Sequence, residues 1–168
     1  MNTVGIRDRT RPDLPYCVAV LAEVHRLDRY PLNWPANPED WLSPSNALNA
    51  WVAETAQGRI LGHVAVHRAD LATNPASAPV AEVSRLFVAP AARGHAVGAR
   101  LLTRVRQWAA EHRFSLNLEI VDHQLSTSAI ALYERTGWRH THTTVAPWTG
   151  PAGEPVRLRR YTLPEDQP

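Results

Sequence analysis

The chain has 168 residues, and all 18 of its basic residues are arginine, so lysine is absent. The absence of lysine excludes enzymes that need a Schiff-base lysine, a phosphate-loop lysine or a lysine general base. The single cysteine, Cys17, excludes an intrachain disulfide framework and a zinc site of several thiolates. The formal net charge of +2 is too small to indicate binding to nucleic acid or to an anionic membrane.

Length and composition predict one globular domain spanning 1–168, because about 170 residues form one core and 44% of them are hydrophobic. No apolar run reaches the length of a membrane span, and the polar stretch 1–13 lacks the hydrophobic region of a signal peptide. Together with the single cysteine, these features predict a cytoplasmic protein with no membrane or nucleic-acid partner.

Hydrophobic periodicity and turn residues predict alternating strands and helices. In chain order the elements are a strand at 4–7, a helix capped by Asp13 that ends near 28, a helical turn at 39–42, strands at 50–54, 60–67 and 81–88, a helix from 97, a strand at 116–121, a helix at 127–136, and strands at 138–145 and 156–163. A loop is predicted at 70–80, and Gly137 is a natural C-cap. This order predicts a three-layer α/β (α+β) fold with a mixed sheet.

The stretch 29–46 contains four prolines and three large aromatic residues, Tyr30, Trp34 and Trp41. Proline-rich stretches of this kind are typical of loops, and large aromatics in a loop usually line a cavity. We therefore expect these three aromatics to line a substrate pocket, together with the loop 147–154.

The segment from 81 to about 100 contains a strand, a tight turn and the beginning of the clearest helix. A helix N-terminus presents free backbone N–H groups and the positive end of the helix dipole, so it can bind an anion without lysine. Gly94 and Gly98 would let the backbone approach a phosphate closely, although Gly98 is equally explained by close packing of the helix.

At this segment the sequence resembles the GNAT superfamily of N-acetyltransferases. The strand ends in Leu-Phe-Val-Ala-Pro at 86–90, and the family hallmark Gln/Arg-x-x-Gly-x-Gly/Ala falls on 93–98, with Ala96 in place of the first glycine. A second signature, Ala-Ile-x-Leu-Tyr-Glu-x-x-Gly-aromatic, matches 129–138. The resemblance implies a GNAT fold, with about 6–7 strands splayed between 81–88 and 116–121 and flanked by about four helices.

The resemblance also implies acetyl-CoA as co-substrate, and Tyr133 as the acid that protonates the leaving thiolate. A tyrosine is protonated at pH 7 and can serve as this acid, although Tyr133 could simply pack under the sheet. Ser126 takes the place of a family asparagine, and Gln124 is an alternative source of that amide. The implied coenzyme contacts are Leu86, Phe87, Val88, Arg93, Gly94, His95, Ala96, Val97, Gly98, Ala99 and Ser126.

An amine must lose a proton before it attacks a thioester, so a general base is expected. Glu82 is the first candidate, because it matches the position of a base in histone-type members, and Glu119 on the neighbouring strand is the second. Either carboxylate could instead be structural, for example paired with Arg85, and a water chain could replace both. The donor to the thioester carbonyl is expected to be the backbone N–H of Val88 or Phe87.

The histidines and remaining arginines have competing explanations. His63 with His67, and His140 with His142, are pairs that could supply metal ligands, but no His-Glu-x-x-His pattern is present, so no metal site is predicted. Three arginines at 157–160 are best explained as a solvated face, whereas Arg93, His95 and Arg100 are placed to meet the coenzyme phosphates.

These features predict an N-acetyltransferase that acts on the primary amine of a small molecule by direct attack in a ternary complex. Two alternatives remain open at this point: a protein or peptide amine as the acceptor, and a non-catalytic acyl-CoA-binding module. The resemblance is also compatible with a homodimer.

Overall fold

The computed structural model describes residues 3–69 and 78–165. A seven-stranded sheet forms the centre, in the order β1-β2-β3-β4-β5-β7-β6. The strands are β1 Val4–Asp8, β2 Ala47–Thr55, β3 Ile60–Arg68, β4 Val80–Val88, β5 Ser115–Val121, β6 Arg139–Thr149 and β7 Pro155–Thr162. Only β4 and β5 pair in parallel; the other neighbours are antiparallel. The predicted loop at 70–80 lies largely outside the described residues.

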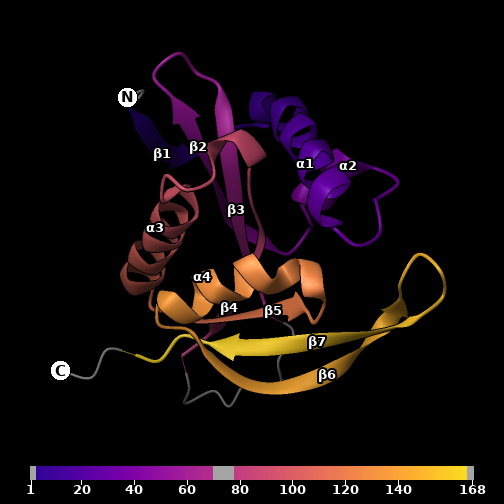
Figure 1. The fold of residues 1–168 in the computed structure, drawn as a ribbon. Coiled ribbons are helices and arrows are strands. Elements are labelled where there is room, and N and C mark those ends of the chain that lie inside the picture. Colours follow the sequence, from indigo (N-terminus) through magenta and orange to yellow (C-terminus); the bar gives the residue numbers. More distant parts are fainter. Residues whose placement is uncertain (1–2, 70–77, 166–168) are drawn as a thin grey trace.

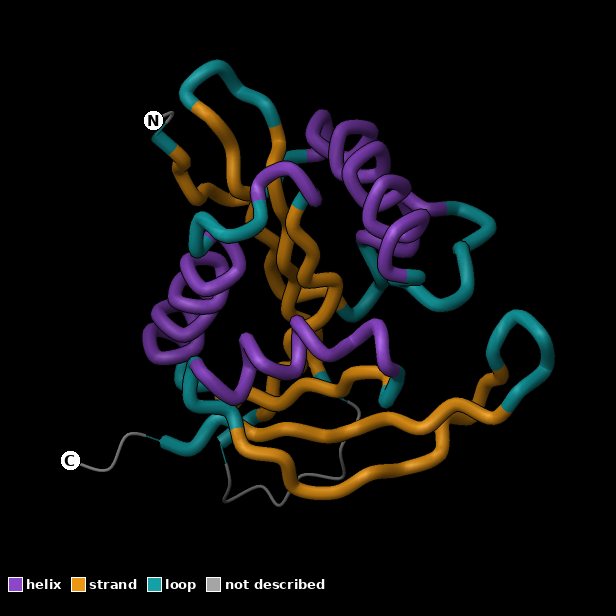
Figure 2. Tube along the Cα trace, in the orientation of Figure 1, coloured by secondary structure: helices purple, strands orange, loops and turns teal. Residues whose placement is uncertain are grey.

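Four helices cover the sheet: α1 Leu14–Asp28, α2 Pro38–Leu42, α3 Val97–His112 and α4 Thr127–Arg135. The apolar stripe of α3, including Leu101 and Val105, packs with α4 on one face of the sheet. The other face carries α1 and α2, which bury Leu21 and Leu42 against Val52 of β2. Figures 1 and 2 show the sheet between these two helical layers, with the long β6–β7 hairpin extending beyond them.

The fold confirms the predicted mixed sheet, its seven strands and its four helices. A short 3-10 turn at Arg11–Asp13 precedes the first long helix, which begins at Leu14 with Asp13 as its N-cap residue, as the sequence predicts. The Asp13 carboxylate accepts two hydrogen bonds from the Arg7 guanidinium, each 2.8 Å long, which join β1 to the start of α1. None of the helices in the described part of the chain has the length and hydropathy of a membrane span.

Candidate active site

The sheet opens between its two parallel strands. Residues Val80–Val83 of β4 pair with Ser115–Leu118 of β5, and the pairing stops there although β4 continues to Val88 and β5 to Val121. The predicted splay between these strands is therefore confirmed. Beyond Val83, the β5 side of β4 has backbone groups that no longer pair within the sheet, which makes this opening the natural place for a ligand.

A β-bulge in β4 lies at the opening. The register passes from His63–Phe87 to Ala65–Ser84, so β4 contains one residue more than β3 across this interval. Arg85, in this interval, has a φ of 52°, in the left-handed region that non-glycine residues seldom adopt. The extra residue reverses the alternation of the strand: Val83 faces the α3 layer, whereas Phe87 packs in the α1 layer.

His63 holds this bulge from the neighbouring strand. Its imidazole is fully buried and stacks on Phe87, with ring centroids 5.1 Å apart. Nδ1 donates to the carbonyl of Arg85 over 2.8 Å, and Nε2 accepts from Arg9 Nη1 over 2.8 Å, so the ring is the neutral Nδ1–H tautomer. Burial, together with the nearby Arg9 and Arg85 charges, lowers the pKa of His63 to about 3. His63 is therefore uncharged, and it fixes the backbone of the bulge through its bond to the carbonyl of Arg85.

The backbone at the end of β4 directs one N–H group into the opening. Ala89 donates its N–H to the carbonyl of Leu61 on β3, over 2.7 Å. Successive N–H groups of an extended strand point to opposite edges, so the N–H of Val88 faces away from β3 and toward the splay. Of the two donors expected from the sequence, this geometry favours Val88 over Phe87.

The turn before α3 exposes its backbone as the sequence predicts. Residues 93–96 are exposed, and Gly94 has a φ of 79°. The first intrahelical N–H bond of α3 is donated by Arg100 to the carbonyl of Ala96, which leaves the N–H groups of residues 97–99 without an intrahelical acceptor. Three N–H groups beside an exposed turn can receive the oxygens of a pyrophosphate.

The structure shows the backbone and packing at two small residues of the predicted hallmark. Ala96, which replaces the first family glycine, has a φ of 59° and a ψ of 21°, in the left-handed region. The glycine that the family places there would adopt this conformation without strain. Gly98 is buried, and a Cβ added to it would lie 2.9 Å from Leu132 Cδ2, so its small size permits close packing of α3 on α4.

The side chains of the turn have internal partners. Arg93 forms an ion pair with Asp28 at the end of α1, which ties that helix to the turn. His95 Nδ1 donates to the carbonyl of Arg93 over 3.0 Å. Arg100 is exposed on α3. The backbone N–H groups are therefore the more direct anion donors, with the arginines around them.

Tyr133 lies in the hydrophobic core formed with α3, α4 and the sheet. Its ring lies edge-on to Trp138, with centroids 6.1 Å apart, and 6.3 Å from the ring of Tyr161. Burial, reinforced by the hydroxyl of Tyr30 across the site, raises the pKa of Tyr133 well above its ordinary value. The phenol therefore keeps its proton at neutral pH, as a general acid requires.

The two candidate bases have different surroundings. Glu82 lies on β4 opposite His67 of β3, with 3.8 Å between a carboxylate oxygen and His67 Nε2, and its side chain is 18% exposed. Glu119 on β5 forms an ion pair of 2.9 Å with Arg160 of β7 and is more exposed. The strong ion pair gives Glu119 a structural explanation, so the geometry favours Glu82 as the base.

Two residues before α4, Ser126 and Gln124, are the candidates for one coenzyme contact. Ser126 is the N-cap residue of α4 and is partly buried, without a side-chain capping bond. Gln124 begins an exposed turn at Gln124–Ser126. Both residues lie in the connection between β5 and α4.

Two of the three predicted pocket aromatics come together. Tyr30 and Trp41 are edge-to-face, with ring centroids 6.1 Å apart, and burial raises the pKa of Tyr30 to about 12. Trp41 also lies under the Arg85 guanidinium, 4.4 Å from its central carbon. Trp34 lies elsewhere: it packs on His25, 5.1 Å away, and is 41% exposed.

The loop that carries these aromatics also reaches the β6–β7 hairpin. Asn33 Nδ2 donates to the carbonyl of Thr149 at the end of β6, over 2.8 Å. Leu32 packs against Val121 of β5 and Leu158 of β7. These contacts join the loop 29–37 to the far strands and to the end of β6.

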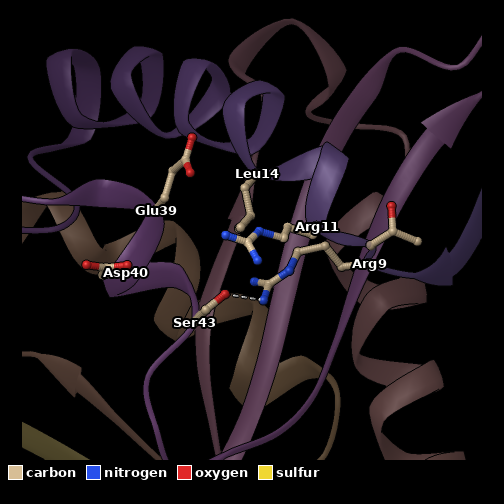
Figure 3. Close-up of a pocket in the computed structure, with 7 residues that line it drawn as sticks. Arg9, Arg11, Leu14, Glu39, Asp40 and Ser43 are labelled. Carbon is tan, nitrogen blue, oxygen red and sulfur yellow. Dashed lines mark hydrogen bonds between the residues drawn. The ribbon is translucent and has the colours of Figure 1, made fainter.

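A charged hollow adjoins the site on the α1–α2 layer (Figure 3). Its volume is about 350 Å³, and it is lined by Arg9, Thr10, Arg11, Leu14, Glu39, Asp40 and Ser43. Arg9 connects the hollow to the bulge, because its guanidinium donates to Ser43 Oγ over 2.6 Å as well as to His63. Within 3–69 and 78–165, no three His, Cys, Asp or Glu side chains are grouped to hold a metal ion.

Sequence reasoning missed the roles of three residues: Arg9, which donates to His63; His63, which binds the carbonyl of Arg85; and Arg85, which was considered only as a partner for Glu82. The available signal was an arginine within the otherwise apolar end of the strand 81–88. A charged side chain there breaks the alternation that a regular strand would show, which indicates a bulge.

Comparison with known proteins identifies the family. The model of the acetyltransferase (GNAT) family matches residues 17–138. A search of curated proteins returned no match to the sequence. Among solved structures, the chain is similar to a protein provisionally assigned as a phosphinothricin N-acetyltransferase, with 22% identity, a TM-score of 0.75, and coverage of 98% of this chain and 100% of that one.

Two further structural neighbours are acetyltransferases. NAA60 from Arabidopsis thaliana, in complex with acetyl-CoA, has 14% identity and a TM-score of 0.73, covering 95% of this chain and 97% of that one. The ribosomal-protein-S18-alanine N-acetyltransferase from Escherichia coli has 16% identity and a TM-score of 0.70, covering 99% of both chains. At these identities the likeness is one of fold, whereas the family model spans most of the sequence. The chain belongs to the GNAT family of acetyltransferases, enzymes that use acetyl-CoA.

Proposed function

We propose that residues 1–168 act as one domain that transfers the acetyl group of acetyl-CoA to the primary amine of a small molecule. The observation that carries this proposal is the opening of the sheet between β4 and β5, which lies at the β4 bulge and leads into the exposed turn before α3. Tyr30 packs in the layer of α1 and α2, and Tyr133 packs in the layer of α3 and α4, so the two tyrosines belong to the two layers that flank the sheet.

The residues present fit acetyl-CoA. The exposed turn 93–96 and the free N–H groups at the start of α3 are suited to its pyrophosphate, and the splay between β4 and β5 is suited to its extended arm. Bound there, acetyl-CoA supplies an activated thioester. Residues 94 and 96 of the loop carry at most a methyl group, which leaves room for the phosphates beside the backbone.

The chain's own groups supply the remaining chemistry. The N–H of Val88 donates to the carbonyl oxygen, where negative charge develops, and one such donor contributes about 3 kcal/mol. Tyr133 donates its proton to the departing sulfur. Glu82 accepts the proton of the amine, directly or through water, and its carboxylate also attracts the ammonium form of the acceptor.

Direct attack by the amine is favoured over an acetylated enzyme. The single cysteine, Cys17, is fully buried in α1, and burial raises the pKa of its thiol to about 12. A buried thiol that stays protonated is a poor nucleophile. The acceptor therefore attacks the thioester while both substrates are bound.

The acceptor side of the site favours a small molecule. Tyr30, Trp41 and Arg85 pack on one another there, and the bond from Asn33 to Thr149 joins the loop 29–37 to the β6–β7 hairpin. A loop fastened in this way restricts access for a polypeptide. Among the structural neighbours, the provisional phosphinothricin N-acetyltransferase has a small-molecule acceptor in its name.

The test is release of free thiol from acetyl-CoA in the presence of separate panels of small primary amines and of peptides. We expect amine-dependent release with at least one small amine, and an acetylated product of matching amount by mass spectrometry. Release with peptides alone would replace the small-molecule acceptor by a protein one. Tight coenzyme binding without release for any amine would indicate a non-catalytic module.

A further inference from the structure

Arg85 is a partly buried cation on the acceptor side of the site. Within the described residues, its guanidinium forms no ion pair within 4 Å, and its one hydrogen bond runs from Nε to the carbonyl of Trp41 over 3.1 Å. The guanidinium is partly buried, and this burial lowers the pKa of Arg85. The two terminal nitrogens, which form the fork that binds carboxylates in pairs, keep their donors for another partner.

The position of the fork is fixed by the backbone conformation at the bulge and by two contacts. The positive φ at the bulge sets the direction of the Arg85 side chain, and His63 holds the carbonyl of the same residue. The Trp41 ring supports the plane of the guanidinium from below, 4.4 Å away. A guanidinium that is already stacked and directed loses little conformational freedom when it binds an anion.

The fork lies among the aromatics of the acceptor side. The Arg85 guanidinium lies over the Trp41 ring, and that ring is edge-to-face with Tyr30. Glu82, the candidate base, lies three residues before Arg85 on β4. The acceptor side therefore presents a carboxylate for an ammonium group and a guanidinium fork for an anion within one short stretch of strand.

We infer that the acceptor amine carries a carboxylate, as an amino acid does, and that Arg85 is the residue that binds it. This inference rests on the proposed function and specifies its substrate class. The carboxylate docks on the two terminal nitrogens of Arg85, while the amino group is directed toward Glu82 and the thioester. Two other arginines, Arg9 and Arg11, line the neighbouring hollow (Figure 3). A substitution in that hollow is therefore the matched control for Arg85.

The experiment compares phenylalanine with phenethylamine, which differ by the carboxylate, on the wild type and on Arg85→Gln. We expect the wild type to prefer phenylalanine, and the variant to lose roughly 10- to 100-fold in kcat/KM for phenylalanine alone, the effect of a charge-assisted hydrogen-bonded pair. Arg85→Lys keeps the charge without the fork and should give an intermediate loss. Arg11→Gln, in the hollow, should leave both substrates unchanged.

The outcomes separate this inference from the proposed function. Equal loss for both amines, a wild-type preference for phenethylamine, or loss on Arg11→Gln in place of Arg85→Gln would overturn the role of Arg85 while leaving acetyl transfer in place. If neither amine is acetylated, calorimetric titration of phenylalanine decides the binding role of Arg85, and the amine panel decides acetyl transfer separately. If phenylalanine binds the wild type and both Arg85→Gln and Arg85→Lys weaken this binding, the inference is supported. If phenylalanine does not bind the wild type, the inference is overturned.

Discussion

The buried His63 makes the stability of the fold depend on pH in a defined window. The pKa of its imidazole is near 6.5 in the unfolded chain and falls to about 3 in the folded one. Between these values the unfolded chain binds a proton that the folded chain excludes, so the free energy of unfolding falls by about 1.4 kcal/mol per pH unit as pH decreases. The stability is fully present above pH 6.5, and about 3 kcal/mol is lost by pH 4.5.

His63 changes the stability already at pH values above the range in which Asp13 does so. Hydrogen bonds from Arg7 hold the pKa of Asp13 well below its ordinary value of 3.8. A depressed carboxyl pKa contributes stability above the unfolded value, and this contribution is lost only as pH falls below about 3.8. The interval from pH 6.5 to 4.5 therefore reports on His63 and leaves the Asp13 contribution constant.

Urea unfolding of the wild type and of His63→Gln, from pH 7.5 to 4.5, measures this effect. Glutamine can accept from Arg9 but does not titrate, so we expect the wild type to lose about 3 kcal/mol more than the variant across the window. His142→Gln is the control, because His142 is exposed on β6, and it should keep the wild-type slope. Parallel curves for the wild type and His63→Gln would refute the buried, neutral histidine.

Three further changes test the site. Tyr133→Phe should lower kcat by about 10²- to 10⁴-fold with unchanged binding of coenzyme A, and an unchanged kcat would remove Tyr133 as the acid. Glu82→Gln should lower kcat/KM by about 10²-fold at neutral pH, and the activity should partly recover at high pH, where the amine is already deprotonated. Glu119→Gln is the comparison, and a larger loss of kcat/KM in that variant would make Glu119 the base. Ala96→Gly removes the strain of an alanine in the left-handed region and should raise the free energy of unfolding by up to about 1 kcal/mol. Thermal unfolding measures this effect, and a lower Tm for the variant would contradict the prediction.

Much of the fold follows from local patterns in the sequence. The helical spacing of Val97, Leu101 and Val105 places α3 correctly, and the apolar residues of 81–88 and 116–121 place β4 and β5 to within one residue. These signals are strong because each element buries one face, and burial fixes its periodicity. The splay between β4 and β5 came from the family resemblance, since neither strand carries a local sign of it.

The details of the site depend on long-range contacts that no local pattern encodes. The bulge at Arg85 is held by His63, 22 residues earlier, and Arg93 is paired with Asp28, 65 residues earlier. Ala96 adopts a left-handed conformation that its residue type disfavours. Such features arise because tertiary contacts override residue preferences, and they occur here at the site itself.

The most direct test of the account is initial-rate kinetics with both acetyl-CoA and a small amine varied. Attack in a ternary complex, catalysed by Tyr133 and Glu82, predicts thiol release that requires the amine, equals the amount of acetylated product, and gives intersecting double-reciprocal lines. Parallel lines would indicate an acetylated enzyme, and thiol release independent of every amine tested would contradict acetyl transfer altogether.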